Sequence, residues 1–184
     1  MPSWSRIARR IRVPLGFAFA AIYIWLAHPT WTSIFGGAAI ALAGVALRAM
    51  ASGHVQKNAE LATTGPYAWS RNPLYLGSMI IGAGFAVAAL SWWVVLGLFV
   101  LFLAIYIPVV RSEESFLRQQ FPRYDDYARR VPRFIGIPAR NHGDIQRGAF
   151  SRALYLKHRE YNAAIGTFAM LAALAAKLFW LRPS

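Results

Sequence analysis

Cysteine and acidic residues are the scarce groups in this chain. Its 184 residues include 0 Cys and 7 Asp or Glu, against 20 Lys or Arg, for a formal net charge of +13. The absence of cysteine excludes disulfides, thiolate catalysis and thiolate metal sites, and it suits polar segments that face a reducing compartment. The basic excess is compatible with nucleic acid, with anionic lipid or with membrane orientation, and the placement of the charges decides among them.

The signatures of soluble cofactor enzymes are also missing. The chain has no G-x-G-x-x-G after a strand, no P-loop, no H-E-x-x-H and no G-x-S-x-G. Its 4 histidines are dispersed along the sequence, so we expect no metal site. Because no pattern of stacking aromatic and basic residues stands outside the apolar segments, we expect no nucleic-acid partner either.

Long apolar runs dominate what is present. Hydrophobic residues make up 57% of the chain and the mean hydropathy is +0.38, which indicates an integral membrane protein. A bilayer core about 30 Å thick needs roughly 20 apolar residues per helix. The sequence therefore predicts an all-α membrane bundle, one domain over residues 1–184, with five helices at residues 13–27, 30–50, 73–90, 92–110 and 161–181.

The first of these segments has a competing interpretation. Four arginines precede a short apolar stretch, as in a secretory signal peptide. The stretch ends Trp25-Leu26-Ala27-His28-Pro29, without a small-x-small cleavage site, so we favour a retained helix.

The basic residues predict the orientation. With a cytoplasmic N-terminus, five helices place residues 1–12, 51–72 and 111–160 on one side, with all of the 20 Lys and Arg except Lys177 and Arg182. The opposite connections, at His28-Pro29 and Leu90-Ser91, carry no basic residue. We therefore expect a bacterial plasma-membrane protein whose polar face is cytoplasmic and contacts anionic membrane lipids.

Small residues recur in the second and third helices, among them Gly77, Gly82 and Gly84. Helix packing is the simpler interpretation, because small residues let helix backbones approach closely. Gly82 and Gly84, with Pro108 in the fourth helix, also offer places where neighbouring helices need not close tightly.

The segment GPYAWSRNPLYLG, residues 65–77, combines a turn with a helix start. Thr-Thr-Gly-Pro-Tyr at residues 63–67 is a turn signature that delivers Tyr67 and Arg71 on a loop. Asn72 before Pro73 predicts a helix opening in which the Asn side chain caps free N–H groups and the positive helix end attracts an anion. The alternative is an interfacial turn with a snorkelling arginine and an aromatic anchor.

A second polar cluster, with Glu113 and Glu114, follows the fourth helix. Pro108 is expected to kink or loosen the helix just before it and to make room for a carboxylate that faces a cavity. Adjacent helical residues differ by about 100°, so the two carboxylates cannot share one face. We expect one to pair locally with Arg111 or Arg118 and the other to face the pocket. The alternative is a solvated, charged helix.

Four ordered motifs carry a family resemblance: GHVQKN, GPYAWSRNPLYLG, RSEESFLRQQFPRYDDY and VPRFIGIP, at residues 53–58, 65–77, 111–127 and 131–138. Together they resemble the isoprenylcysteine carboxyl methyltransferase and phospholipid methyltransferase superfamily of membrane enzymes. The resemblance covers about residues 36–138 and leaves residues 139–184, with the fifth helix, as an extension. It implies S-adenosylmethionine as cofactor, a lipid-linked or amphiphilic methyl acceptor, and a pocket at the cytosolic face.

The resemblance also implies a set of site residues. The implied cofactor-binding residues are His54, Tyr67, Arg71, Asn72, Tyr75, Gly77, Glu113, Glu114 and Tyr127. The implied catalytic residues are Arg71, Glu114 and Arg133. Asn72 stands where carboxyl methyltransferases have His, whereas phospholipid methyltransferases have Asn-Pro there, so carboxylate and amine acceptors both stay open. Integral sterol reductases, which use NADPH, carry a similar motif set, and a non-enzymatic lipid-binding protein is a further alternative.

The residue types at these positions suit methyl transfer. Tyrosines attract a sulfonium through cation–π interaction, and the carboxylate of Glu113 or Glu114 can accept from an ammonium or from ribose hydroxyls. Arg71 or Arg133 suits a carboxylate, because guanidinium binds such anions in a fork. A carboxylate acceptor needs no general base, whereas a protonated amine must first lose a proton.

Overall fold

The computed structural model describes residues 18–56, 60–135 and 149–180, and its regular elements there are all helical. Residues 18–26 are helical. The longer elements are α2 (Trp31–Ser52), α3 (Pro73–Ala89), α4 (Trp92–Leu101), the π-helix Phe102–Tyr106, α5 (Ile107–Gln120) and α8 (Tyr161–Trp180). The short ones are the 3-10 helix Gly65–Ala68, α6 (Tyr124–Arg130) and α7 (Arg152–Lys157).

Three helical runs are long and apolar enough to cross a bilayer: Trp31–Ser52, Trp92–Gln120 and Tyr161–Trp180. They confirm three of the five predicted spans as long apolar helices. The predicted helix at 73–90 is present as α3, which has 17 residues and is short for a span. In the first predicted segment, residues 13–17 lie outside the described part of the chain, as do Lys57 and Asn58 of the first motif and residues 136–138 of the last.

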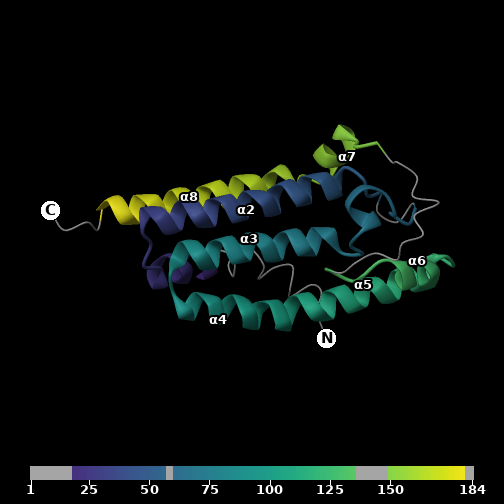
Figure 1. Ribbon diagram of the computed structural model, residues 1–184, viewed down its shortest axis with the longest axis horizontal. Helices are drawn as coiled ribbons and strands as arrows, with labels where there is room; N and C mark the ends of the chain where they lie inside the picture. Colours follow the sequence, from purple (N-terminus) through teal and green to yellow (C-terminus); the bar gives the residue numbers. More distant parts are fainter. Residues whose placement is uncertain (1–17, 57–59, 136–148, 181–184) are drawn as a thin grey trace, which may run out of the picture.

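The long helices lie side by side along the long axis of the molecule (Figure 1). Both tight connections, residues 27–30 and 90–91, lie at one end, which we call the turn end. The loop before α3, with α6 and α7, lies at the other, which we call the polar end. The two short connections therefore share one end of the bundle, and the charged loops within the described residues lie at the other.

The interface between α2 and α3 is the most closely packed in the bundle. A Cβ atom on Gly84 would lie 2.5 Å from the carbonyl oxygen of Gly37, and one on Gly44 would lie 2.6 Å from that of Gly77. These glycines let the two backbones touch, as the packing interpretation predicted. The expectation that the helices pack loosely at Gly84 is therefore wrong, because α2 and α3 are in close contact there. Gly82 faces more open space, because among the described residues the one atom near a Cβ there would be Leu98 Cδ2, at 4.0 Å.

The turn end has its own apolar core, which includes Tyr23, Ile34 and Leu174. Its polar groups bond to backbone: the Tyr23 hydroxyl donates to the Phe85 carbonyl at 2.9 Å. The Lys177 ammonium donates to the carbonyl oxygens of residues 24, 25 and 27, at 2.6, 3.2 and 2.7 Å. Because helix-terminal carbonyls lack helical partners, this lysine ties α8 to the end of the helix at residues 18–26.

The fourth predicted helix does not end at Val110 but continues without a break to Gln120. Pro108 has no N–H for the carbonyl of Ala104, and its ring would crowd that carbonyl. The chain accommodates the proline with the π-helix Phe102–Tyr106 rather than with a sharp break. The loosening expected before Arg111 is confirmed in this form, and α5 then carries Glu113 and Glu114 into the polar end.

Candidate active site

Glu114, a buried carboxylate on α5, is the centre of the polar end. The residue is 5% exposed, yet it is surrounded by cationic and amide donors. The Arg133 guanidinium donates from Nε to Oε1 at 3.0 Å and from Nη2 to Oε2 at 2.7 Å. This two-pronged bond stabilises the ionised carboxylate, and hydrogen bonding to Glu114 raises the pKa of Arg133 above its usual value.

Asn72 and Arg71 bring a second segment to the same carboxylate. The Asn72 side-chain amide donates to Glu114 Oε1 and to the carbonyl oxygen of Arg133, both at 3.2 Å. Arg71 Nη1 lies 3.7 Å from Glu114 Oε1, and the Arg71 backbone N–H donates to the Pro132 carbonyl at 2.9 Å. The loop before α3 and the segment after α6 are therefore joined across Glu114.

The predicted capping role of Asn72 is wrong. Asn72 does precede the first helical residue, Pro73, but its side chain makes no capping hydrogen bond to α3. Its two amide protons are used by Glu114 and by the Arg133 carbonyl. A charged acceptor forms the stronger hydrogen bond, which explains why the amide turns away from the helix end.

The guanidinium of Arg71 has hydrogen-bond partners for only some of its donors among the described residues. Its Nη1 donates weakly to the Tyr124 hydroxyl at 3.5 Å, and its Nε is buried without a hydrogen-bond partner among the described residues. Leaving a buried donor unpaired costs about 1–3 kcal/mol, so such a group calls for an explanation. An acceptor on a bound ligand would supply one.

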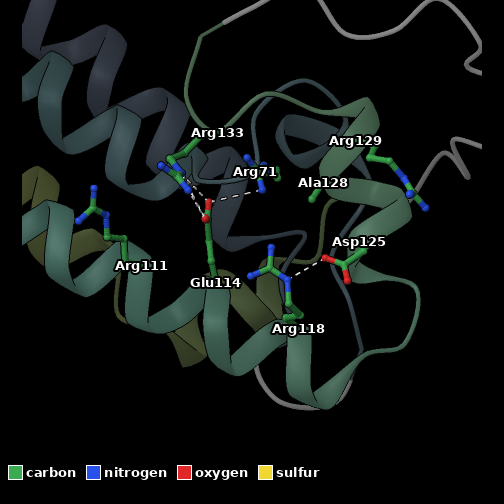
Figure 2. Close-up of a pocket in the computed structure, with 8 residues that line it drawn as sticks. All are labelled: Arg71, Arg111, Glu114, Arg118, Asp125, Ala128, Arg129 and Arg133. Carbon is green, nitrogen blue, oxygen red and sulfur yellow. Dashed lines mark hydrogen bonds and ion pairs between the residues drawn. The ribbon is translucent and has the colours of Figure 1, made fainter.

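A polar cavity of about 660 Å³ opens beside this cluster. It is lined by Arg71, Arg111, Glu114, Arg118, Asp125, Ala128, Arg129 and Arg133. Figure 2 shows Arg71 and Arg133 turned toward Glu114, with Arg118 turned toward Asp125. Five arginines against two carboxylates give the cavity lining a net positive charge, which favours an anionic group.

Two buried tyrosines support the wall of the site. The Tyr127 hydroxyl donates to the Tyr67 carbonyl at 2.7 Å and so fixes α6 against the 3-10 helix. Burial raises the pKa of both phenols, and for Tyr67 the charge of Glu113 adds to the effect. Both therefore stay neutral near pH 7 and serve as hydrogen-bonding groups rather than as bases.

Glu113 points elsewhere, as the helical spacing predicted. It is exposed, and it accepts a hydrogen bond from the Tyr75 hydroxyl at 2.7 Å. Neither carboxylate has the local arginine partner that we expected. Glu114 pairs with Arg71 and Arg133 from distant segments, while Arg118 pairs with Asp125.

His54 and Gly77 lie apart from the Glu114 cluster. The His54 ring packs beside Phe150, with its Nδ1 2.8 Å from the Met50 carbonyl oxygen. Gly65 has φ +57, and a Cβ there would lie 2.6 Å from His54 Cδ2, so the turn needs glycine. Gly77 faces α2, where a Cβ would meet Arg48 Cγ at 2.6 Å. The cofactor-binding roles of both residues stay predictions.

Sequence reasoning left two polar-end residues out of the predicted site. Tyr124 is 1% exposed, lies between two arginines, and has the Arg118 guanidinium 5.6 Å from its ring centroid. No sequence signal distinguished it from its neighbours. Arg48 was detectable, because a charged residue inside an apolar run marks a special site. It donates to Glu160 at 2.7 Å and to the Leu74 carbonyl at 3.2 Å, which ties α2 to the start of α8 and to α3.

The long apolar helices, with a charged site at one end, define an integral membrane protein. The family model of the phospholipid methyltransferases matches residues 15–124, which is more than half of the chain. The chain belongs to this family, and membership implies methyl transfer from S-adenosylmethionine. The predicted family resemblance is therefore confirmed, whereas the isoprenylcysteine-type specificity is not part of this match.

Two curated relatives match a shorter stretch. The nickel-cobalt-cadmium resistance protein NccN of Alcaligenes xylosoxydans xylosoxydans is 42% identical over 82 residues, which cover 44% of this chain and 38% of the relative. The cobalt-zinc-cadmium resistance protein CzcN of Cupriavidus metallidurans is 41% identical over 82 residues, covering 44% and 37%. The chain thus matches less than two fifths of either relative's length. No solved structure matches the chain significantly.

Proposed function

We propose that this protein transfers a methyl group from S-adenosylmethionine to an amphiphilic or lipid-linked acceptor at the cytosolic face of a bacterial plasma membrane. The observation that carries the proposal is the Glu114 cluster with its arginine-lined cavity, where the apolar helices end. Arg71 and Glu114 lie within the family-matched residues 15–124, and Arg133 follows them. A charged site at that depth can meet a soluble cofactor from one side and a lipid from the other.

The residues present fit the cofactor. The Nε of Arg71 has no hydrogen-bond partner within the described ranges and lines a cavity rich in arginine, so it suits the carboxylate of the methionine part. The exposed carboxylate of Glu113 suits its ammonium group or the ribose hydroxyls. When bound, S-adenosylmethionine supplies an electrophilic methyl group on a sulfonium. The protein then has to bind the cofactor and the acceptor, orient them for transfer, and exclude water from the site.

The arginines and the two carboxylates of the site have different tasks in this proposal. Arg71 and Arg133 hold anionic groups, while Glu114 fixes the position of both guanidinium groups. A carboxylate acceptor then needs no base. An amine acceptor has to lose a proton first, and Glu113 is the exposed carboxylate next to the cluster that can take it.

An apolar cavity of about 760 Å³ supports an acceptor with a hydrocarbon tail. Its lining is Trp25, Leu26, Trp93, Leu96, Gly97, Val100, Leu101, Ala104 and Ile105. The cavity follows α4 toward the π-helix, so a tail lying there would lead to the polar end. Each buried methylene contributes about 0.8 kcal/mol to binding. Because α2 and α3 are closed at Gly84, this side of α4 is the better route for entry from the bilayer.

Ligand binding tests the proposal most directly. Calorimetry on folded, detergent-solubilised protein should show S-adenosylmethionine and its demethylated product binding at roughly one per chain. Arg71→Ala should weaken this binding about tenfold, the loss of one charge-assisted contact. Arg129→Ala is the matched control: it lines the same cavity, but its side chain is 76% exposed and pairs with Asp126, so we expect less than about a twofold change.

The contrary results are specific. Saturable NADPH binding without binding of the adenosyl ligand would move the chain to the reductase relatives. Binding of amphiphiles alone would favour a non-enzymatic lipid-binding protein. Equal losses in Arg71→Ala and Arg129→Ala would remove Arg71 from the site.

The acceptor is tested with a labelled methyl donor in lipid vesicles. Carboxylate and amine amphiphiles of increasing tail length should show rising kcat/KM, because the tail is bound by the membrane and by the apolar cavity. Equal or faster turnover of short, water-soluble acceptors would contradict membrane entry.

Orientation is tested in this cysteine-free chain with single cysteines. His28→Cys at the turn end and Arg123→Cys at the polar end are both exposed. An impermeant thiol reagent applied to intact cells should label the first and leave the second unlabelled until the cells are opened. The reverse pattern would place the site on the outside.

A further inference from the structure

Four aromatic rings meet beside Glu113. Tyr106 of the π-helix stacks on Phe102, with ring centroids 5.3 Å apart, and meets the Tyr75 ring edge-on at 5.7 Å. Phe134 lies 6.3 Å from Phe102. We call Phe102, Tyr106, Tyr75 and Phe134 the aromatic cluster. Its members come from α3, from the π-helix and from the segment after α6, so only the folded chain brings them together.

The π-helix places two of these rings. A π turn is wider than an α turn, and such turns are common at functional sites. Here the turn precedes Pro108 and stacks residues 102 and 106 over one another, with 25° between the ring planes. The π-helix before Pro108 therefore contributes two rings of the aromatic cluster, Phe102 and Tyr106.

Glu113 gives the aromatic cluster an anionic partner. Glu113 is exposed and accepts a hydrogen bond from the Tyr75 hydroxyl at 2.7 Å. No ion pair within the described part of the chain involves it, in contrast to Glu114, which has two arginines. Arg48 is paired with Glu160 at 2.7 Å. Ring faces and an uncompensated carboxylate attract a cation of low charge density.

The aromatic cluster and the arginine cavity therefore have opposite preferences. Arg133 binds Glu114, and the next residue, Phe134, belongs to the aromatic cluster. One polar end thus offers a place for an anion and, next to it, a place for a cation. A ligand that carries a carboxylate and a sulfonium a few bonds apart matches both.

We propose that the aromatic cluster, with Glu113, binds the sulfonium of S-adenosylmethionine and thereby distinguishes the methyl donor from its neutral thioether product. The inference rests on the proposed function. It gives Tyr106, Phe102 and Phe134 a role that the family-like motifs did not assign. Weaker attraction of the neutral product favours its exchange for a fresh donor.

The test compares the dissociation constants of S-adenosylmethionine and S-adenosylhomocysteine in a maltoside detergent, which carries no cation of its own. Tyr106→Leu should weaken binding of the sulfonium ligand about tenfold and change that of the thioether less than about twofold. Tyr106→Phe keeps the ring and should retain the ratio of the wild-type protein. Phe116→Leu is the control. It removes an exposed ring of α5 that is not part of the aromatic cluster, so it should change neither dissociation constant.

The outcomes separate this inference from the proposed function. Should Tyr106→Leu weaken both ligands equally or neither, the cation site is overturned while the methyltransferase assignment stands. A Tyr106→Phe variant that no longer distinguishes the two ligands as the wild-type protein does would also overturn the cation site. Because Tyr106→Phe preserves packing, it remains a test if Tyr106→Leu fails to fold. Wild-type protein that binds neither ligand overturns the proposed function itself.

Discussion

Both ends of this bundle hold a charged side chain against other elements, but they do so with different partners. At the turn end, Lys177 donates to the backbone carbonyls of residues 24, 25 and 27. At the polar end, Glu114 is held by the side chains of Arg71, Asn72 and Arg133. Backbone partners are fixed by the helix that carries them, whereas side chains can turn to a ligand. We therefore infer that the turn end holds helices together and that the polar end binds a ligand.

The largest effect is expected at Glu114. Glu114→Gln removes the counterion of Arg71, which is 14% exposed and already has one partnerless donor among the described residues. Breaking a buried pair from one side costs about 3 kcal/mol. We expect a lower thermal midpoint in detergent and at least tenfold weaker binding of S-adenosylmethionine, about 1.4 kcal/mol. Glu113→Gln is the control for stability, because that residue is exposed. Equal stability of the two variants would show that Glu114 does not hold the segments together.

The middle of the bundle provides a reference between the two ends. In Gly84→Ala the new Cβ lies 2.5 Å from the Gly37 oxygen, so the backbones have to separate, at a cost of about 2 kcal/mol. Gly82→Ala, two positions earlier, meets only Leu98 at 4.0 Å and should be neutral or stabilising by up to about 1 kcal/mol. Thermal unfolding of the pair measures the difference. Similar midpoints would mean that α2 and α3 can separate at little cost.

Lys177→Met should have a smaller effect and should affect stability alone. The change removes donors from three carbonyls but keeps an apolar side chain of similar length. Because those carbonyls can bind water at the end of the bundle, we expect a loss of about 1 kcal/mol. Calorimetry should give the wild-type affinity for S-adenosylmethionine. A large loss of affinity would mean that the two ends are coupled and are not specialised as we infer.

The smallest effect is expected for the Arg118 and Asp125 pair. Their side chains are 54% and 59% exposed, so Asp125→Asn should cost less than about 0.5 kcal/mol although the bond is 2.7 Å long. Ligand affinity should change less than about twofold. A loss as large as that of Glu114→Gln would show that exposure does not separate the binding groups from the surface groups at this end.

The helices, and the gathering of the described charged loops at one end of the bundle, were predictable because they depend on local composition. Apolar runs of the right length, Pro73 at a helix start and glycines spaced along α2 and α3 all act through neighbours a few residues away. The separate directions of Glu113 and Glu114 follow from helical geometry alone, and the structure confirms them. Local pairing of Glu114 with Arg111 or Arg118 failed, because the better partners arrive from residues 71 and 133.

The sequence by itself determined that the chain is an apolar helical bundle with most of its charges at one end, and its motifs determined the family. Only the tertiary structure decided that Asn72 bonds to Glu114 instead of capping α3, and that Arg71 keeps an Nε without a partner among the described residues. It also decided that Phe102, Tyr106 and Phe134 meet beside Glu113. Helix formation depends on contacts within a few residues, whereas a binding site depends on which distant segments the packing of α2, α3 and α5 brings together.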